Sequence, residues 1–577
     1  MNQLIKSSVV AVSLLVSSVI TNAQTNKGIK STDVPHGWHL LDKAKDGYNG
    51  ISINEAYAFV KSKNLKSNPV IVAVIDSGID TLHEDLKTIL WNNPKEIPGN
   101  GKDDDGNGYV DDVHGWNFIG GKDGKNVKQD SYEGARVYHA LKKKYGGAEL
   151  DTAKLKGDSL DEYKTWLTAK AKIEGEGQEG GGLDLVMLKR ALTSAQKSDS
   201  ILRKALNKDT FTGNDLDTFQ ASSVAEKAAK GGLIYLFRAN QMMETTNVDF
   251  LQGFGEFVGG EERKAESREK PPVPYRAQVV GDNENNINDK FYGNNDIMAA
   301  TPFHGTHVSG IIAAARDNNK GIDGIADNVK IMMVRAVPDG DEHDKDIALA
   351  IRYAVDNGAK VINMSFGKDF SPQKKWVDEA VKYAESKNVL LVHAAGNDAK
   401  DIDSADNYPN PNIKGSTERA GNWITVGASG DEKAGGITAP FSNYGKHEVD
   451  VFAPGVKIYS TVPGKTNYAN AQGTSMAAPV VAGTAAFLLE YFPHLTAAQL
   501  KNVIEKSAQI FGDSVRKPGS DDLVKLDELS KTGGLINAYE AAKLADSMNP
   551  DNSAVDEKSS RRKNKKSPKS VVEIKQN

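Results

Sequence analysis

The sequence contains no cysteine in its 577 residues. Disulfide bonds are therefore excluded, and so is a lipid anchor attached to an N-terminal cysteine. If the protein is exported, packing or bound metal must stabilise it in place of covalent cross-links.

Long apolar runs are also missing beyond the first twenty-odd residues. Lys6 precedes an apolar stretch from Val9 to Ile20, and Thr21-Asn22-Ala23 supplies the small residues that a signal peptidase reads. The stretch is shorter than the roughly 20 residues of a spanning helix. We therefore expect residues 1–23 to be a signal peptide of an exported protein, periplasmic or extracellular, with no membrane segment after cleavage. An uncleaved anchor is the alternative.

Positive charge is not in excess, because the net charge is −5 at pH 7. Residues 558–577 hold eight Lys and Arg against one Glu, so the rest of the chain is more acidic than the total suggests. This distribution disfavours a nucleic-acid-binding face. The segment 549–577 has few large apolar residues, and we expect a disordered basic tail, either simply solvated or attracted to anionic polymers and lipids.

Short apolar runs recur along the chain and are typical of buried strands. Residues 69–75 form a continuous, mostly β-branched run. Similar runs cover 330–334, 361–364, 389–394 and 423–426, and helical patterns cover 313–318, 346–357 and 374–386. This alternation predicts an α/β fold with a mostly parallel sheet and helices on both faces.

The sequence between residues 131 and 270 has a different pattern of apolar residues. Apolar residues at helical spacing occur in 160–171 and 188–202, a third helical candidate covers 223–244, and glycine-rich breaks separate these pieces. We expect a helical insertion within the α/β domain. Helices are also predicted at 496–507, with Thr496 as N-cap in capping-box spacing to Gln499, and at 535–548.

Three polar segments carry most of the chemical information. Asp76-Ser77-Gly78 ends the first apolar run, His304-Gly305-Thr306-His307 opens a small-residue helix, and Gly473-Thr474-Ser475 opens another. Taken singly, Asp76 could be a turn-forming residue, His304 a structural histidine and Ser475 a helix cap. Together they place an acid, a base and a hydroxyl in one chain, and the first-turn amides at Ser475 could bind negative charge.

These segments resemble those of subtilisin-like serine peptidases, the subtilases, over roughly residues 37–545. The order Asp, His, Ser is that of the family, and Gly473-Thr474-Ser475-Met476-Ala477 lacks the second glycine of an α/β-hydrolase elbow. The resemblance implies a subtilisin-like fold in two parts, 24–130 and 271–548. It also implies that Ser475 is the nucleophile, His304 the general base and Asp76 the orienting carboxylate, with no catalytic role for His307.

The resemblance also implies an oxyanion donor and a peptide-binding edge. Asn397, in Ala394-Ala395-Gly396-Asn397, matches the family's oxyanion amide. Ser365, Phe366 and Gly367 resemble the strand that pairs with an extended peptide. With Ala394 and Gly396 they suggest a roomy, uncharged pocket and a preference for bulky apolar residues before the cleaved bond.

An acidic loop suggests calcium. Its residues Asp103, Asp105, Asn107, Tyr109 (through its carbonyl) and Asp111 follow the D-x-D-x-N-G pattern, with Asp112 as a further oxygen source. The twelfth position is His114 and not the Glu of an EF-hand, so a solvated acidic turn is the alternative. Asp85 matches a calcium-binding aspartate of many subtilases, with 317–319 as the partner loop. We expect Ca²⁺ as a structural cofactor.

Two features depart from the family. The 53 residues between the expected cleavage at Ala23 and Asp76 leave no room for a separate inhibitory prodomain of the usual size. Asp76 and His304 are 228 positions apart, mostly because of the helical insertion, which could be a surface decoration, a lid, an exosite or a folding aid. We expect an exported endopeptidase acting on proteins or peptides. The alternatives are an inactive scaffold acting as a secreted binding protein, and an esterase or ligase using the same acyl-enzyme.

Overall fold

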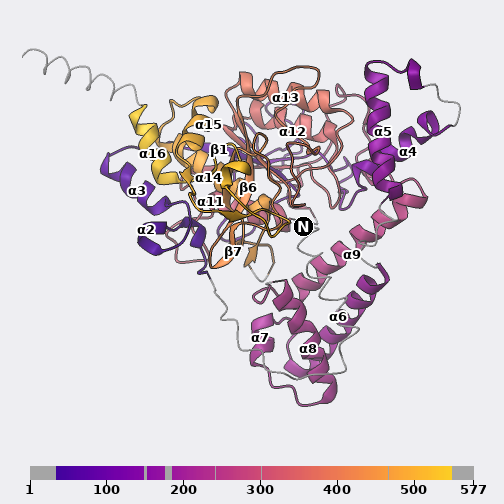
Figure 1. Cartoon of the computed structure of the whole chain (residues 1–577), viewed down its shortest axis with the longest axis vertical. Coiled ribbons are helices and arrows are strands. Elements are labelled where there is room, and N and C mark those ends of the chain that lie inside the picture. Colours follow the sequence, from indigo (N-terminus) through magenta and orange to yellow (C-terminus); the bar gives the residue numbers. More distant parts are fainter. Residues whose placement is uncertain are drawn as a thin grey trace, which may run out of the picture.

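A computed structural model describes residues 34–147, 152–175, 185–240, 242–299, 302–464 and 467–548 (Figure 1). The expected signal peptide and basic tail lie outside the described residues. Within the described part of the chain, no helix is long and apolar enough to cross a membrane.

A ten-stranded sheet forms the centre of the fold. The strand order is β11-β14-β8-β6-β5-β4-β1-β3-β2, with β7 pairing β6. The strands are β1 (Val70–Asp76), β2 (Gly115–Asn117), β3 (Val329–Arg335), β4 (Val361–Met364), β5 (Leu390–Ala394), β6 (Trp423–Asp431), β7 (Ala434–Thr438), β8 (Val451–Pro454), β11 (Gln509–Ile510) and β14 (Gly534–Leu535). The pairs β1–β3, β1–β4, β4–β5 and β5–β6 are all parallel, which confirms the predicted mostly parallel sheet.

Helices cover both faces, as the continuous apolar character of β1 predicts. Val70, Val72 and Val74 belong to a core with α11 and α14, whereas Ala73 and Ile75 belong to a second core with α12 and α13. Alternate residues of a strand point to opposite faces, so both faces of β1 are buried. The helices of this part are α2 (Lys43–Asp46), α3 (Ile53–Ser62), α11 (Phe303–Ala313), α12 (Asp344–Asp356), α13 (Lys374–Ser386), α14 (Thr474–Tyr491), α15 (Ala497–Lys506) and α16 (Ala538–Ser547).

One predicted helix was wrong. The pattern at 313–318 predicts a helix, but α11 ends at Ala313. Asp317 and Asn319 have positive φ angles of 58° and 59°, which a helix does not accommodate. The helix of this region is instead the small-residue helix predicted to open at His304, and its residues are buried nearly all round, without the amphipathic spacing that marks a surface helix. By contrast, α15 begins after the predicted capping box of Thr496 and Gln499.

Shorter elements complete this part of the chain. Two small antiparallel sheets pair β9 (Ile458–Thr461) with β10 (Tyr468–Ala471), and β12 (Val515–Arg516) with β13 (Leu523–Val524). Single 3₁₀ turns occur at Trp38–Leu40 and Leu526–Glu528.

The segment expected to be a helical insertion is helical. It contains α4 (Glu133–Tyr145), α5 (Asp158–Gly175), α6 (Leu185–Leu206), α7 (Gly213–Thr218), α8 (Val224–Ala239) and α9 (Asn247–Glu269), followed by α10 (Tyr275–Val279) and with a 3₁₀ turn at Thr152–Lys154. Figure 1 shows α6, α7 and α8 grouped away from the sheet, with α9 running from this group towards α4 and α5. Leu202, Phe211, Leu233, Phe237 and Phe250 form a separate apolar core there.

A buried acid in α14 makes the folded state sensitive to pH. Glu490 is fully buried, and its Oε1 accepts a hydrogen bond from the Asn328 amide at 2.9 Å. Burial, followed by the negative charge of Asp327, raises the pKa of Glu490 from 4.5 to about 9. The folded state therefore holds this proton more tightly than the unfolded chain does, and stability is lost as pH rises from about 4.5 to 9.

We predict that Glu490→Gln reduces this loss. The amide keeps an oxygen for Asn328 and has no charge to bury, so the free energy of unfolding at pH 8 should rise by on the order of 2 kcal/mol. Melting temperatures at pH 5 and pH 8.5 measure the effect, with Glu379→Gln, at an exposed position of α13, as control. If the melting temperature fell equally between pH 5 and pH 8.5 in Glu490→Gln, in Glu379→Gln and in wild type, the prediction would be contradicted.

Candidate active site

Asp76 and His304 form a hydrogen-bonded pair at the carboxyl end of β1. His304, in the first turn of α11, directs Nδ1 to both carboxylate oxygens of Asp76, at 2.8 and 2.9 Å. Asp76 is 2% exposed, whereas the His304 side chain is 33% exposed. The close approach of α11 to the segment after β1 requires glycine at position 305, where a Cβ would lie 2.2 Å from the Gly78 carbonyl oxygen. One ring edge is thus fixed by the carboxylate, and the other remains accessible.

The charge of Asp76 changes the proton affinity of the ring. Burial lowers the pKa of His304, but the nearby negative charge and the hydrogen bond of Asp76 outweigh burial, so the pKa is raised above 6.5. Because Nδ1 carries the proton shared with Asp76, the neutral ring presents an unprotonated Nε2.

His307, three residues further on, has a different environment. It is fully buried, and its Nε2 donates to the carbonyls of Ile458 and Ala469, both at 3.1 Å. Burial lowers its pKa to about 4, so the ring is neutral at pH 7. His307 ties α11 to the β9–β10 pair and does not contact Asp76 through any described hydrogen bond.

Ser475 lies in the first turn of α14, whose N-cap is Gly473. Its Oγ donates a hydrogen bond to the Ser365 carbonyl at 3.0 Å, and Ser365 Oγ donates in return to the Ser475 carbonyl at 2.9 Å. No hydrogen bond between Ser475 and His304 occurs among the described residues. The structure therefore brings together Asp76 and His304, and separately Ser475 and Ser365.

Strand register places both pairs at one edge of the sheet. Ile75 of β1 is the register partner of Met364 of β4, so Asp76 and Ser365 follow the ends of neighbouring parallel strands. Met364 is in turn aligned with His393 of β5, shortly before the loop that carries Asn397. The carboxyl edge of an open α/β sheet is where such folds place their sites.

Asn397 is held with a defined amide orientation. Its Oδ1 accepts hydrogen bonds from the Thr474 amide at 2.8 Å and from the Thr474 hydroxyl at 3.0 Å. Both donors require an oxygen, so Nδ2 must be the other atom. Nδ2 has no hydrogen-bond partner among the described residues, and a Cβ on Gly473 would lie 3.6 Å from Nδ2, from Oδ1 and from the Ser475 amide nitrogen. The sequence pattern identified Asn397 but gave no indication of the role of Thr474.

The residues expected to bind substrate lie beside Ser475. Ser365 is buried, Phe366 is half-buried and Gly367 is exposed. The Phe366 carbonyl accepts a hydrogen bond from His393 Nε2 at 2.8 Å, which fixes this segment from the sheet side. Ala394 is buried at the end of β5, and Gly396 adopts a φ of 99° that favours glycine.

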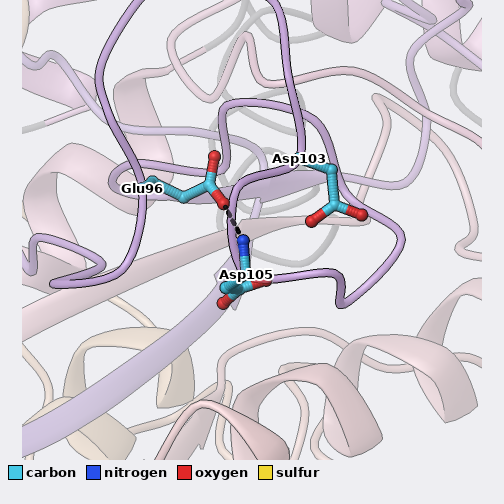
Figure 2. Close-up of side chains that lie close together, drawn as sticks. All are labelled: Glu96, Asp103 and Asp105. Atoms are coloured by element: carbon cyan, nitrogen blue, oxygen red, sulfur yellow. Dashed lines mark hydrogen bonds between the residues drawn. The ribbon is translucent and has the colours of Figure 1, made fainter.

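Part of the acidic loop forms a carboxylate cluster. Glu96, Asp103 and Asp105 each place an oxygen within 4.8 Å of the others, and Figure 2 shows the three side chains together. Glu96 Oε1 accepts from the amides of Asp104 and Asp105, at 2.9 and 3.1 Å, whereas the buried Oε2 has no hydrogen-bond partner. The spacing of the D-x-D-x-N-G pattern did not reveal Glu96, because it precedes the motif.

The other residues of the loop pattern have different contacts. Asn107 Oδ1 accepts from the Tyr109 amide at 2.8 Å, and the Tyr109 ring is buried in an aromatic group. The Asp111 carboxylate accepts from the amides of Asn100 and Gly101. Asp112 accepts from Tyr353, at 2.6 Å, and from Asn93 and Asn107. The carboxylates of Asp111 and Asp112 thus lie outside the three-residue cluster.

Asp85 lies elsewhere and contacts the expected partner loop. It is fully buried, with Oδ1 accepting from Asn318 Nδ2 at 2.5 Å and Oδ2 from the Tyr468 hydroxyl at 2.8 Å. Neutral donors therefore occupy both of its oxygens, and no group of three acidic or histidine ligands forms around it among the described residues.

Comparison with known proteins gives a concordant result. The thermophilic serine proteinase of Bacillus sp. (strain AK1) is 40% identical over 239 residues, 41% of this chain and 51% of that protein. Subtilisin DY of Bacillus licheniformis is 37% identical over 212 residues, 37% of this chain and 72% of that protein. Thermitase of Thermoactinomyces vulgaris is 37% identical over 244 residues, 41% of this chain and 74% of that protein.

The chain therefore spans about half the length of the first of these relatives and nearly three quarters of the other two. The sequence pattern of the subtilase family matches residues 67–539, a range that includes Asp76, His304, Asn397 and Ser475. With its parallel sheet and the polar groups at the carboxyl ends of β1, β4 and β5, the chain belongs to the subtilase family.

Proposed function

We propose that this chain is an exported serine endopeptidase that hydrolyses peptide bonds through an acyl-enzyme on Ser475. The observation that carries the proposal is the buried Asp76 carboxylate holding His304 by Nδ1, at the same sheet edge as Ser475 and the free amide of Asn397. Export is supported by the sequence pattern of residues 1–23.

The first step requires a rotation of the Ser475 side chain. In the structure Oγ donates to the Ser365 carbonyl, and the proposed mechanism requires a rotation about χ1 that would redirect the hydroxyl towards His304 Nε2. Oγ then attacks the substrate carbonyl carbon while its proton passes to Nε2. Asp76 stabilises the imidazolium that forms, and this imidazolium donates the proton to the departing amine.

Hydrolysis of the acyl-enzyme repeats the proton transfers with water as nucleophile. His304 takes a proton from water, the hydroxide oxygen bonds to the acyl carbon, and the bond from that carbon to Oγ breaks as Ser475 regains its proton. The products are the two peptides and free enzyme, so atoms and charge balance over the cycle.

Two donors would stabilise the oxyanion in both steps. Asn397 Nδ2 is one, because Thr474 occupies the Oδ1 side of the amide. The Ser475 amide is the other, since the first amides of a helix have no acceptor within it. Phe366 and Gly367 would pair with an extended substrate backbone, and the small residues Ala394 and Gly396 favour a bulky apolar side chain before the cleaved bond.

Calcium fits the acidic cluster. The unpartnered, buried Oε2 of Glu96 lies beside two further carboxylates, and hard oxygen ligands of this kind suit Ca²⁺. Glu96, Asp103 and Asp105 would hold the ion, which would neutralise their mutual repulsion and fix the loop between β1 and β2.

A fluorophosphonate probe tests the proposed function directly. We predict labelling of folded wild-type protein at Ser475 and none of Ser475→Ala. Absence of labelling in folded wild type would favour the inactive binding scaffold. Partitioning of a peptide ester between water and an added amine distinguishes a hydrolase from a ligase, because the two differ in acyl acceptor. Cleavage of a peptide amide in addition to the ester distinguishes a peptidase from an esterase.

Removing the oxyanion donor should lower turnover with little effect on substrate affinity. We predict that Asn397→Ala lowers kcat by about 10²- to 10³-fold, the loss typical of one oxyanion donor in this family. Thr474→Val, which removes only one of the two bonds to Asn397 Oδ1, should have a much smaller effect. Equal kcat in wild type and Asn397→Ala, on a peptide anilide, would refute the oxyanion role.

The raised pKa of His304 sets the acid limit of activity. The base must be neutral, so kcat/KM should fall below an apparent pKa that is higher than 6.5. In Asp76→Asn the ring loses its negative neighbour, and its titration by NMR should move to lower pH. The His307 signal should titrate near pH 4 in both proteins. A His304 titration unchanged by Asp76→Asn would contradict this assignment.

Removal of calcium should destabilise the protein. We predict that EDTA lowers the melting temperature of wild type by a few degrees and that added Ca²⁺ restores it, because an ion bound only by the folded state stabilises it. Glu96→Gln should weaken this response, whereas Asp104→Asn, in the same loop but outside the cluster, should retain it. Identical melting curves with EDTA and with Ca²⁺ would exclude a structural ion here.

A further inference from the structure

The three residues after the expected substrate edge contact the helical insertion. Lys368, Asp369 and Phe370, here called the anchor segment, directly follow Ser365–Gly367. Each of the three side chains has a partner in α4 or α5. The insertion thus contacts the chain directly after the expected binding edge. The anchor segment that makes these contacts is part of neither the catalytic geometry nor the sequence motifs.

Lys368 is a buried cation that depends on the insertion. Its side chain is 1% exposed, and Nζ lies 2.9 Å from Glu133 Oε2 of α4, 2.9 Å from Asp344 Oδ1 and 2.8 Å from the Glu342 carbonyl. A buried ammonium is tolerated only when its charge and its donors are matched. Glu133 supplies one of the two counter-charges, so α4 helps to fix the backbone immediately after Gly367.

Phe370 packs into the insertion itself. Its ring belongs to an apolar cluster with Val137, Tyr138 and Ala169, which come from α4 and α5. The approach is close, because a Cβ on Gly134 would lie 2.9 Å from the ring. Packing of this kind is sensitive to shifts of a few tenths of an ångström, so the anchor segment follows the position of the two helices.

Asp369 connects the insertion to the other wall of the site. Its carboxylate pairs with Lys172 of α5 and with Lys400, whose Nζ lies 3.2 Å away. Lys400 is three residues after Asn397, in the same loop. Lys172 also lies 5.4 Å from the centre of the Phe370 ring. One carboxylate therefore joins α5, the substrate edge and the loop of the oxyanion donor.

We propose that α4 and α5 position the substrate-binding edge, with Glu133 and Lys172 acting as positioning residues through Lys368 and Asp369. This inference rests on the proposed peptidase function. It assigns to the start of the insertion a role in binding the part of the substrate that precedes the cleaved bond. Substrates long enough to pair with Phe366 and Gly367 are affected, whereas a single-residue ester is not.

Deletion of the whole insertion would not test the positioning role specifically. A deletion of residues 135–270 removes Arg136, which binds both Glu133 and the backbone of Asp341 and Glu342. It also removes Val137, Tyr138 and Ala169, which cover Phe370. Loss of activity in the deletion would follow from a lid, an exosite or a positioning role alike. Single substitutions at the contact separate these possibilities.

The decisive variants are Lys172→Gln and Asp369→Asn, each of which breaks the same partly exposed ion pair. With a tetrapeptide anilide we expect KM to rise about 2- to 5-fold, as for an exposed pair of this kind, with kcat changed less than 2-fold. With a single-residue ester both constants should equal those of wild type. The double variant should show no larger rise in KM than Asp369→Asn alone, because Lys172 acts only through the carboxylate that this variant already removes, whereas Asp369 also pairs with Lys400.

Lys170→Gln is the matched control. Lys170 lies on the same helix and pairs within it, with Glu174, so both constants should equal those of wild type. Lys172→Arg should restore the tetrapeptide KM. A purely structural role would lower the melting temperature and leave KM unchanged. Glu133→Gln, which removes a counter-charge from buried Lys368, should raise KM further, by about 10-fold, if the variant folds.

The outcomes distinguish this inference from the proposed function. Equal tetrapeptide KM in wild type, Lys172→Gln and Asp369→Asn would overturn the positioning role, provided that fluorophosphonate labels Ser475 normally in all three. Absence of labelling in wild type would instead remove the peptidase proposal itself. Additive rises in KM for the double variant would also count against the inference, since they would mean that the two residues act independently.

Discussion

The site depends on one constraint, the alignment of β1, β4 and β5 as neighbouring parallel strands whose carboxyl ends share an edge. Asp76, Ser365 and the Asn397 loop come together because each follows one of these strands. The strands are buried on both faces, so a one-residue slip in register would exchange the side chains that pack in the two cores. The hydrogen bond from His304 to Asp76 therefore rests on the sheet, and the residues between them in sequence can vary in number.

This constraint explains how a long insertion can separate the acid from the base. Asp76 ends β1, and His304 begins α11, which packs on β1 in the same apolar core. The distance between the two side chains is set by that packing and by the absence of a side chain at Gly305. Among the described residues, none of the insertion 131–270 belongs to the two cores beside the sheet, so the length of the insertion does not enter the geometry of the pair.

The sequence predicted those features that depend on local pattern. The continuous apolar runs of β1 and β4 gave their bounds closely, and the acid, histidine and serine segments were evident from residue type and spacing. What it could not give depends on contacts between distant residues. Glu96 joins Asp103 only through the folded loop, Thr474 fixes the Asn397 amide, and the Ser475 hydroxyl donates to Ser365. The small-residue helix opened by His304 was predicted as well, but its end at Ala313 was not, because a helix buried all round has no amphipathic period that marks its limits.

Buried charge then ties the insertion to the peptidase part, in a protein that has no disulfides. Arg136 of α4 binds Glu133 and the Asp341 carbonyl, and Arg276 of α10, where the chain re-enters the peptidase part, is fully buried and bound by Asp346 of α12 and by Asp282. Such pairs add little net stability, but losing one partner leaves an uncompensated charge in the interior. The insertion and α12 must therefore take up their relative positions together. Since Lys368 shares Glu133 with Arg136, the same electrostatic requirement extends to the edge that would bind substrate.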